Sequence, residues 1–291
     1  MALLVQFIFY LVRLFPVRVA GAIGAGAGRV LYILDARHRS IALRNLDRIY
    51  PEMDDGWKIR VAHESFAEMC RTMFELPHVF LRSQSFLWSR VEFIGLEELE
   101  QARAKGHGIL FVAGHHCNWE LGALLVSPSH SLYRAVRQEP LERFLQSRRE
   151  RFGNTLHDRN DNMRWLPKAL RQGEAVSMMV DQHLSTANPV LFMGHPAQTT
   201  TLPAAYARKY QTPVFSVLLH RIGRSFRFQL ELREIPFPVA ENSKEEDLLQ
   251  CTSLISDRIA QAICPRPELW LWLHRRWLYL DEKEQDKNEK A

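Results

Sequence analysis

Cysteine is scarce in this sequence: four of the 291 residues are cysteines, and no two of them form a CxxC pair. This distribution provides neither a disulfide framework nor the spacing of a zinc site, so we expect a reducing compartment and no bound metal. Glycine and proline, at 14 residues each, are near their background frequency, which excludes a collagen-like fibre and a low-complexity linker. The hydrophobic fraction of 46% and the charged fraction of 24% exclude intrinsic disorder and indicate a packed globular protein.

Long hydrophobic runs are also rare, because only the N-terminal stretch approaches the length of a bilayer span, and this excludes a polytopic membrane protein. Residues 1–12 carry no charge, and Arg13 and Arg18 follow them. A secretory signal would place its basic residues before the apolar core, so the order found here indicates an uncleaved anchor. A helix of this length rises only about 18 Å, less than the ~30 Å hydrocarbon core, so we expect residues 1–34 to form a bent or shallowly inserted membrane-associated helix. The alternative is a helix buried in the protein core.

Negative charge is scarce beside this apolar stretch. Residues 1–50 contain seven arginines and two aspartates, while the net charge of the whole chain is +5. Basic residues next to an apolar segment are attracted to anionic lipid and stay on the cytoplasmic side. These arginines alternate with aliphatic residues and have no aromatic stacking platform, so we expect no nucleic-acid binding. At the other end, residues 281–291 contain five acidic residues and three lysines, and we expect a charged, disordered tail there, after a folded domain over 35–280.

Two patterns of hydrophobicity divide the rest of the chain. Between residues 37 and 90, apolar residues recur every three or four positions, which predicts helices that end near Pro51 and Pro77. After residue 105, short apolar runs alternate with amphipathic stretches, which predicts an α/β fold with a largely parallel central sheet flanked by helices. The expected strands are 108–114, 131–136, 174–180, 212–219 and 225–232, the last two as an antiparallel hairpin joined through 221–224. The expected helices are 118–126, 139–152, 162–172, 199–210 and 245–263.

Polar side chains follow four of these strands. In chain order they are His115, Arg137, Asp181 with Gln182, and His220 with Arg221. In open α/β sheets, ligands bind beyond the carboxyl ends of the parallel strands. The sequence therefore predicts a binding or catalytic site built from these strand ends.

The segment GHHCNWELG, residues 114–122, contains the sharpest candidate pair, His115 and Glu120. An imidazole has an ordinary pKa of about 6.5 and is an effective general base when a carboxylate fixes its tautomer. Because the segment runs from a strand end into a helix, a residue five positions on can reach the histidine. We therefore interpret His115 as a general base oriented by Glu120. The alternatives are a solvated histidine beside an unrelated glutamate, and covalent catalysis by Cys117.

The same block resembles the signature of a known family. His115, Asn118, Trp119 and Glu120 form an H-x-x-N-W-E block, similar to that of the bacterial lipid A biosynthesis acyltransferases, the late lauroyl and myristoyl transferases within the wider HxxxxD/E lysophospholipid acyltransferase group. His116 is a departure, since the family more often has an aromatic residue there, and the five-residue step to a carboxylate selects His115 as the base. Further similar segments, which extend the resemblance over residues 10–280, are Arg39 with Asn45-Leu46, Tyr50-Pro51-Glu52, Arg149-x-Arg151, Asp181-Gln182, Thr199-Thr200-Thr201 and 272–277.

The resemblance implies an O-acyltransferase that moves a fatty acyl chain from acyl carrier protein to a hydroxyl of a lipid A precursor. In this interpretation His115 is the base, and direct attack on an activated thioester needs no nucleophilic Ser or Cys, no metal and no cofactor besides the acyl carrier protein co-substrate. A phosphorylated acceptor or the donor's phosphopantetheine needs positive charge, and an arginine fork suits phosphate. The candidates for binding substrate, phosphate or the developing oxyanion are Asn118, Arg137, Arg149, Arg151, Asp181 and Gln182.

The implied partners are acyl carrier protein, the lipid acceptor and the membrane surface, and the implied location is the cytoplasmic face of a bacterial inner membrane. Two alternatives stay open. One is an enzyme of the same family that acts on another lyso-lipid or glycolipid acceptor. The other is a non-catalytic lipid-binding membrane protein that has kept the fold.

Overall fold

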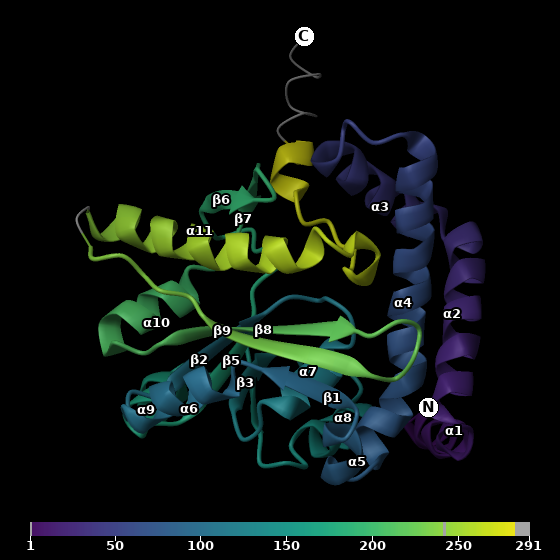
Figure 1. Ribbon diagram of the computed structural model, residues 1–291, viewed down its shortest axis with the longest axis horizontal. Coiled ribbons are helices and arrows are strands. Elements are labelled where there is room, and N and C mark those ends of the chain that lie inside the picture. The colour runs from purple at the N-terminus through teal and green to yellow at the C-terminus, as the bar shows by residue number, and fades with distance from the viewer. Residues whose placement is uncertain (1, 241–242, 283–291) are drawn as a thin grey trace.

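A seven-stranded sheet lies at the centre of the computed structural model, which describes residues 2–240 and 243–282 (Figure 1). The strands pair in the order β1–β9–β8–β2–β5–β3–β4, and every neighbouring pair is parallel except the antiparallel β8–β9 hairpin. Their bounds are β1 Val91–Ile94, β2 Ile109–Ala113, β3 His130–Tyr133, β4 Thr155–Asp158, β5 Ala175–Met179, β8 Val214–Arg221 and β9 Phe228–Glu234. A separate antiparallel hairpin consists of β6 Pro189–Phe192 and β7 His195–Gln198.

Helices cover both faces of this sheet and one of its ends. The N-terminal group comprises α1 Ala2–Leu14, α2 Val17–Leu34, α3 Ala36–Ile49, α4 Asp55–Leu81 and the short α5 Gln84–Trp88. The helices between the strands are α6 Leu96–Ala104, α7 Trp119–Leu125, α8 Glu139–Arg149, α9 Trp165–Arg171 and α10 Leu202–Tyr210. The last helix, α11 Lys244–Ile263, lies above the sheet in Figure 1 and is followed by the 3₁₀ turn η1 Pro267–Leu269.

Strand β2 shows why the sheet is covered on both sides. Its residues point alternately to opposite faces, as the pleat of a strand requires. Leu110 and Val112 pack into a core with α9, α10 and α11, whereas Ile109 and Phe111 pack into a second core with α6 and α7. A run of apolar residues without polar alternation is therefore typical of a central parallel strand buried on both faces.

The predicted α/β fold with a largely parallel sheet is confirmed. Each of the five expected strands and the five expected helices after residue 105 is present, and the β8–β9 hairpin is antiparallel as expected. The prediction that a helix ends near Pro77 is wrong, because α4 continues to Leu81 with Pro77 inside it. The pattern also missed the four-residue strands β1, β4, β6 and β7, which are too short for a clear hydrophobic period, and the helix α6, which buries only Leu99 and Ala102.

The N-terminal layer is held to the domain by unusually close contact between α2 and α4 (right side of Figure 1). Gly24 and Gly28 face α4: a Cβ atom on Gly24 would lie 2.7 Å from the backbone oxygen of Cys70, and one on Gly28 would overlap the backbone of Phe66. Glycine at these positions lets the two backbones approach, and Arg29 adds two hydrogen bonds from Nη2 to the Glu64 carboxylate at 3.0 and 2.9 Å. One side of α2 is therefore part of the protein core.

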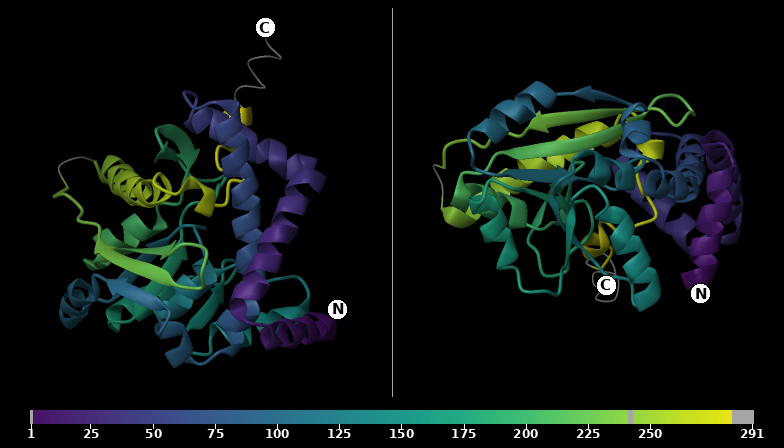
Figure 2. Two further views of the ribbon diagram at one scale, coloured as in Figure 1. Left: turned by 45° about the vertical axis from the view of Figure 1, so that its right-hand side comes forward. Right: turned by 90° about the horizontal axis from the view of Figure 1, so that it is seen from below.

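The other side of α2 and most of α1 are exposed apolar surface. Figure 2 shows α1 turning away from α2 at their connection. By length and composition alone, α2 is a candidate membrane anchor. The exposed apolar residues of α1 and its end recur at helical spacing, which defines an apolar stripe: Leu3, Leu4, Phe7, Ile8, Leu11, Leu14 and Phe15. The stripe faces outward because the opposite side of α1 packs on the domain, where the Phe9 ring contacts Phe80 and Phe144.

The C-terminal part of the chain is described as far as residue 282. Asp281 and Glu282 continue a helical turn, and Asp281 Oδ1 forms an ion pair with Arg48 Nη1 of α3 at 2.9 Å. Most of the charged tail predicted over 281–291 lies outside the described residues.

We predict opposite effects of alanine at two neighbouring glycines of α2. Gly28→Ala places a methyl group against the Phe66 backbone and should separate α2 from α4, lowering the free energy of unfolding by about 2 kcal/mol or more. Gly26→Ala meets nothing within 4 Å and should raise stability by up to about 1 kcal/mol, because alanine favours the helix. Thermal or urea unfolding of both full-length variants measures this difference. Equal stability of the two variants would contradict the close helix packing.

Candidate active site

Two side chains meet where the adjacent parallel strands β2 and β5 end. The register pairs Ala113 with Met179, so His115 and Asp181 stand two residues beyond the paired ends. His115 Nδ1 lies 2.7 Å from Asp181 Oδ1, and the His115 backbone N–H donates to Asp181 Oδ2 at 2.6 Å. Gly114 permits this approach, since a Cβ atom there would lie 3.0 Å from Asp181 Oδ2.

Asp181 is a buried carboxylate with a complete set of donors. In addition to the two contacts from His115, the indole Nε1–H of Trp270 donates to Asp181 Oδ2 at 2.8 Å. Burial alone would raise the pKa of Asp181, but the charge and hydrogen bonds of His115, with the Trp270 bond, hold it well below its ordinary value. Asp181 is therefore ionised at neutral pH.

The ionised carboxylate determines the state of the His115 ring. Burial alone would lower the pKa of His115, but the charge and hydrogen bond of Asp181, aided by the charge of Glu120, raise it above its ordinary value. A carboxylate only accepts hydrogen bonds, so Nδ1 carries the ring proton and Nε2 holds the free lone pair. Gln182 Nε2 lies 3.3 Å from His115 Nε2. This arrangement fixes the tautomer of the imidazole and is suited to a general base.

Glu120 has a different partner from the expected one. Both of its carboxylate oxygens bind Arg149 of α8, with Arg149 Nε 3.0 Å from Oε2 and Nη2 2.5 Å from Oε1. No hydrogen bond joins Glu120 to His115 within the described residues, so the carboxylate that orients the imidazole is Asp181, from the end of β5, instead of Glu120. The cause is local: Glu120 lies in the first turn of α7, while the sheet register brings Asp181 directly beside His115.

A cavity of about 470 Å³ opens in front of these groups. Its inner wall is largely apolar and comes from the strands and α7, with residues such as Phe111, Leu132, Met178 and Val217. Polar side chains gather in the same cavity: His115, Glu120, Tyr133, Arg134, Arg149, Arg159 and Gln182. The size is within the range of small-molecule sites, and the combination fits a ligand with an apolar chain and an anionic or hydroxylated end.

Comparison with known proteins gives the family. A family model described as bacterial lipid A biosynthesis acyltransferase matches residues 1–279. The chain belongs to this family.

Curated relatives cover most of the chain at low identity. The lipid A biosynthesis lauroyltransferase of Escherichia coli (strain K12) is 26% identical over 277 residues, which cover 93% of this chain and 89% of that protein. The lipid A biosynthesis acyltransferase of Haemophilus influenzae is 23% identical over 243 residues, 81% of this chain and 74% of that protein. The phosphatidylinositol mannoside acyltransferase of Mycobacterium tuberculosis is 26% identical over 224 residues, 74% of this chain and 68% of that protein. Acyl transfer is therefore the reaction class of this family member.

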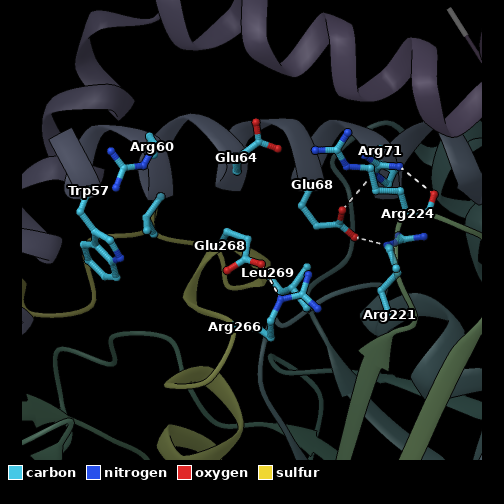
Figure 3. A pocket seen from close by; sticks show the side chains of 12 residues that line it. Trp57, Arg60, Glu64, Glu68, Arg71, Arg221, Arg224, Arg266, Glu268 and Leu269 are labelled. Atoms are coloured by element: carbon cyan, nitrogen blue, oxygen red, sulfur yellow. Dashed lines mark hydrogen bonds and ion pairs between the residues drawn. The ribbon is translucent and has the colours of Figure 1, made fainter.

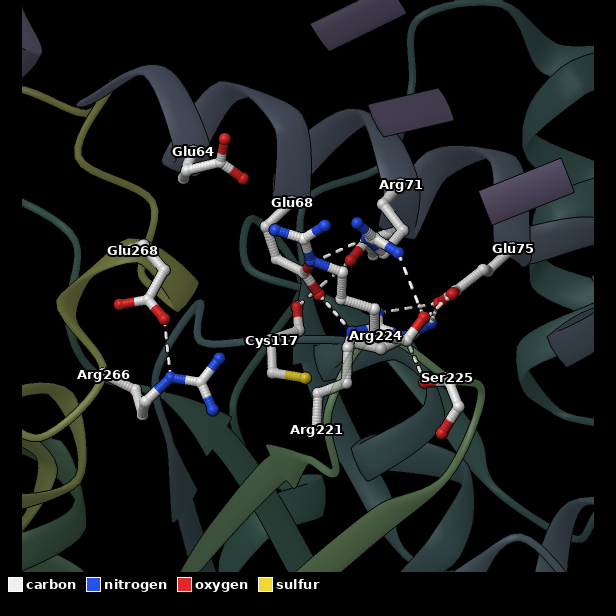
Figure 4. A network of polar contacts seen from close by, with 12 residues as sticks. Glu64, Glu68, Arg71, Glu75, Cys117, Arg221, Arg224, Ser225, Arg266 and Glu268 are labelled. Atoms are coloured by element: carbon white, nitrogen blue, oxygen red, sulfur yellow. Dashed lines mark hydrogen bonds and ion pairs between the residues drawn. The ribbon is translucent and has the colours of Figure 1, made fainter. Parts of the chain in front are cut away.

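In this member of the lipid A acyltransferase family, the Asn118 side chain stabilises the fold through two hydrogen bonds. Its Oδ1 accepts from the Leu121 N–H and caps α7, and its Nδ2 donates to Glu75 Oε2 of α4 at 3.0 Å. Glu75 and Glu68 in turn hold the buried Arg221 at the end of β8, with Nη1 2.8 Å from Glu75 and Nε 2.6 Å from Glu68 (Figure 4). This network fixes the His115–Glu120 segment to the long N-terminal helix.

A second cavity of about 300 Å³ lies beside the network (Figure 3). Its walls carry charges of both signs from α4, the β8–β9 turn and η1. Many of these charges already pair with one another, as in Arg71 with Glu68 at 3.0 Å and Arg266 with Glu268 at 2.5 Å. Figure 3 shows Arg221 and Arg71 pointing toward Glu68. Because its charges bind one another, we interpret the lining of this cavity as a charge network that stabilises the fold of the acyltransferase.

His116 and Cys117 are unsuited to catalysis in this acyltransferase. Burial, together with the charge of His220, lowers the pKa of His116 to about 3, and its Nδ1 lies 3.1 Å from the Leu219 carbonyl oxygen. Burial raises the pKa of the Cys117 thiol to about 12, so the thiolate needed for covalent catalysis is absent at neutral pH. Of the two adjacent histidines, His115 alone has an ionised carboxylate partner.

The three arginines predicted to bind substrate lie in different places. Arg149 lines the cavity, where it remains a candidate for binding substrate. Arg151 instead donates to the backbone oxygens of Val79 and Arg82 near the end of α4, and its guanidinium lies over the Phe152 ring, outside the cavity. Arg137 is exposed and does not line the cavity, where Arg134 and Arg159 lie instead. Both directly follow a strand, Arg134 after β3 and Arg159 after β4, so the rule of reading strand ends applies to them. They were missed because the expected strand extended to residue 136 and because β4 was not expected.

The C-terminal block of the acyltransferase supports the loop after β5. Arg276 is fully buried, and its Nη1 donates to the carbonyl oxygens of Gln182 and Gln198, at 3.0 and 2.8 Å. His274 Nε2 accepts from the His183 N–H at 2.9 Å, and burial lowers the pKa of His274 to about 4, which keeps it a neutral acceptor. The tryptophans of this block are core residues. The block therefore holds Gln182 through Arg276, while Trp270, just before the block, holds Asp181.

The hydrogen bond between His115 and Asp181 predicts a pH profile. Because the pKa of His115 is raised above its ordinary 6.5, activity should fall as the pH decreases through a midpoint above that value, where His115 becomes protonated. Asp181→Asn removes the charge that raises this pKa, so the midpoint should move to lower pH and the maximal rate should drop by about 10² or more. Initial rates of acyl transfer from pH 5 to 9 measure both effects. An unchanged midpoint in Asp181→Asn would contradict the assigned pairing.

Proposed function

We propose that this acyltransferase moves a fatty acyl chain from acyl carrier protein to a hydroxyl of a lipid A precursor, with His115 as the general base. The observation that carries the proposal is an imidazole whose Nδ1 is bonded to a buried carboxylate and whose Nε2 carries the lone pair, placed in a largely apolar cavity beside an arginine. The apolar wall suits an acyl chain, and the polar groups suit its thioester and the acceptor.

The reaction requires two proton transfers, one to His115 and one from it. His115 Nε2 removes the proton of the acceptor hydroxyl, and the oxygen forms a bond to the thioester carbonyl carbon. The tetrahedral intermediate then breaks its carbon–sulfur bond, and the leaving thiolate takes the proton from the imidazolium. Asp181 stabilises the imidazolium in between. No bound cofactor or metal takes part in this scheme.

Arg149 is suited to stabilise negative charge in this reaction. A guanidinium has five N–H donors, and those on Nε and Nη2 of Arg149 are directed to Glu120. Nη1 has no partner within the described residues and lies in a cavity-lining side chain, so it can bind the oxyanion or a phosphate oxygen. In this proposal Glu120 is a positioning residue for Arg149. Arg134 and Arg159 of the cavity, with the exposed Arg137 nearby in sequence, would bind the phosphate of the donor or the acceptor.

Lipid A precursor is the favoured acceptor because the family model is described for lipid A biosynthesis, and relatives such as the lipid A lauroyltransferase and myristoyltransferase of Escherichia coli align over 93% and 90% of the chain, against 74% for the relative named for phosphatidylinositol mannoside. A glycolipid acceptor of the latter kind is the second candidate.

We also propose attachment to the cytoplasmic face of the inner membrane, and the exposed apolar stripe of α1 supports the membrane association in this proposal. A contiguous apolar helix face beside arginines is typical of an interfacial helix. One side of α2 packs on α4, whose charged residues would not enter a bilayer, so α1 and α2 would lie on the membrane surface instead of crossing it. α1 also packs on α8, which carries Arg149, so the cavity would be close to the lipid surface.

We predict that purified enzyme transfers an acyl group from acyl carrier protein to a lipid A precursor in detergent. His115→Ala should reduce the rate by about 10²–10⁴, because the base is lost. Glu120→Gln should also reduce it, through Arg149. The measurement is mass spectrometry of the product, with phosphatidylinositol mannoside offered in parallel.

The matched control for this assay is His107→Ala, an exposed histidine outside the cavity, which should keep wild-type activity. Full activity of His115→Ala would refute the proposed base. Wild-type protein that binds lipid but acylates neither acceptor would favour a lipid-binding protein without catalysis.

The apolar stripe predicts membrane attachment by α1. Leu4→Glu with Phe7→Glu should reduce binding to vesicles by about tenfold or more, because two apolar side chains can no longer be buried in lipid. Val239→Glu changes an apolar residue of 84% exposure far along the chain and should leave binding unchanged. Vesicle flotation measures the bound fraction. Equal binding by all three proteins would place the attachment on another surface.

A further inference from the structure

A third cavity, of about 310 Å³, lies at the foot of the N-terminal layer. It is enclosed by the connection between α1 and α2, the end of α4, α5 and the start of β9. Its polar lining consists of arginines: Arg18, Arg82, Arg90 and Arg227. It shares no lining residue with the cavity at His115.

The arginines around this cavity lack acceptors. Within residues 2–240 and 243–282, the side chains of Arg13, Arg18, Arg82 and Arg90 donate no hydrogen bond and form no ion pair, and the Nε atoms of Arg13, Arg82 and Arg90 are buried without a partner. Arg227 pairs with Glu92 at 3.5 Å, with both side chains more than half exposed. Buried donors without acceptors are rare in folded proteins, and each costs about 1–3 kcal/mol.

These charges also repel one another. Burial, and then the charges of Arg13 and Arg90, lower the pKa of Arg82. The same field acts on His78, which is fully buried: burial, with the charges of Arg82 and Arg13, lowers its pKa to about 4. A bound anion would remove this repulsion and supply the missing acceptors.

The geometry suits a phosphate group. The guanidinium carbons of Arg82 and Arg90 each lie 5.0 Å from the centroid of the Phe86 ring, so both flank the same ring, and the charge of Arg90 acts on Arg82. Two guanidinium forks can bind several oxygens of one phosphate. Leu14 and Phe15, the last residues of the apolar stripe, lie between Arg13 and Arg18 in the chain and are exposed.

We propose that Arg13, Arg18, Arg82 and Arg90 form a binding site for the phosphate of an anionic membrane lipid, whose acyl chains contact the apolar stripe of α1. This site lies apart from the acyl-transfer centre. The proposal rests in part on the membrane attachment described above, since the stripe must face the lipid.

The test compares vesicle binding by the full-length protein and charge-preserving variants. The vesicles are phosphatidylcholine alone, or phosphatidylcholine with phosphatidylglycerol. Wild-type protein should bind the anionic vesicles more tightly. Arg82→Lys with Arg90→Lys keeps the charge but loses the forks, and should lower affinity for anionic vesicles about fivefold; the corresponding pair of Gln variants should lower it about twentyfold. Binding to neutral vesicles should stay as in wild type.

Arg103→Lys is the matched control, because Arg103 is exposed on α6, far from α1 in Figure 1, and should leave binding unchanged. Acyl transfer in detergent should also be unaffected by Arg82→Lys with Arg90→Lys, so failure of this site and failure of the catalytic proposal are distinguishable. If the lysine pair keeps the wild-type preference for anionic vesicles, the preference reflects a diffuse positive field and the proposed site is refuted.

Inorganic phosphate distinguishes the source of the ligand. It should neither displace the protein from anionic vesicles nor raise the unfolding temperature more than chloride at the same ionic strength. If it does both, and the lysine pair abolishes both effects, the ligand is free phosphate and the assignment to a lipid headgroup is wrong.

Discussion

The buried carboxylate of Asp181 is the interaction on which the site depends. It comes from the end of β5 and joins the imidazole and backbone of His115, from the end of β2, to the indole of Trp270 near the C-terminus. An ionised group with 2% exposure is stable only when such donors surround it. The His115 tautomer with the proton on Nδ1 is therefore fixed only when β2 and β5 are in register and Trp270 is in place. This requirement explains why residues near 275 matter to a site that begins at 115.

Much of the fold could be predicted from the sequence, because the central strands are buried on both faces and appear as short apolar runs. Strands of only four residues, such as β1 and β4, are too short to show a clear alternation of apolar and polar residues. Pro77 was misinterpreted as a helix end, since local propensity does not include the burial of α4 between the sheet and α2. In long helices with extensive tertiary packing, one proline is tolerated.

The location of the site could be predicted from the sequence, but the carboxylate that pairs with His115 could not. Reading the residue after each strand brought His115 and Asp181 into one candidate set, because parallel carboxyl ends meet at one edge. The choice of Glu120 as the partner followed spacing along the chain, and spacing cannot show that Arg149 takes both oxygens of Glu120. Arg134 and Arg159 also follow strand ends, but they were missed because the end of β3 was expected at residue 136 and the four-residue β4 was not expected.

The glycine contact between α2 and α4 has a consequence for the geometry of catalysis. α2 is fixed to α4 by backbone contact, and α4 is fixed to the segment of Asn118 by Glu75 and Arg221. If the outer side of α1 and α2 rests on lipid, the imidazole stands at a constant height above the bilayer. Under the proposed function, the distance by which an acceptor hydroxyl projects from the headgroup layer would then decide whether it reaches the imidazole.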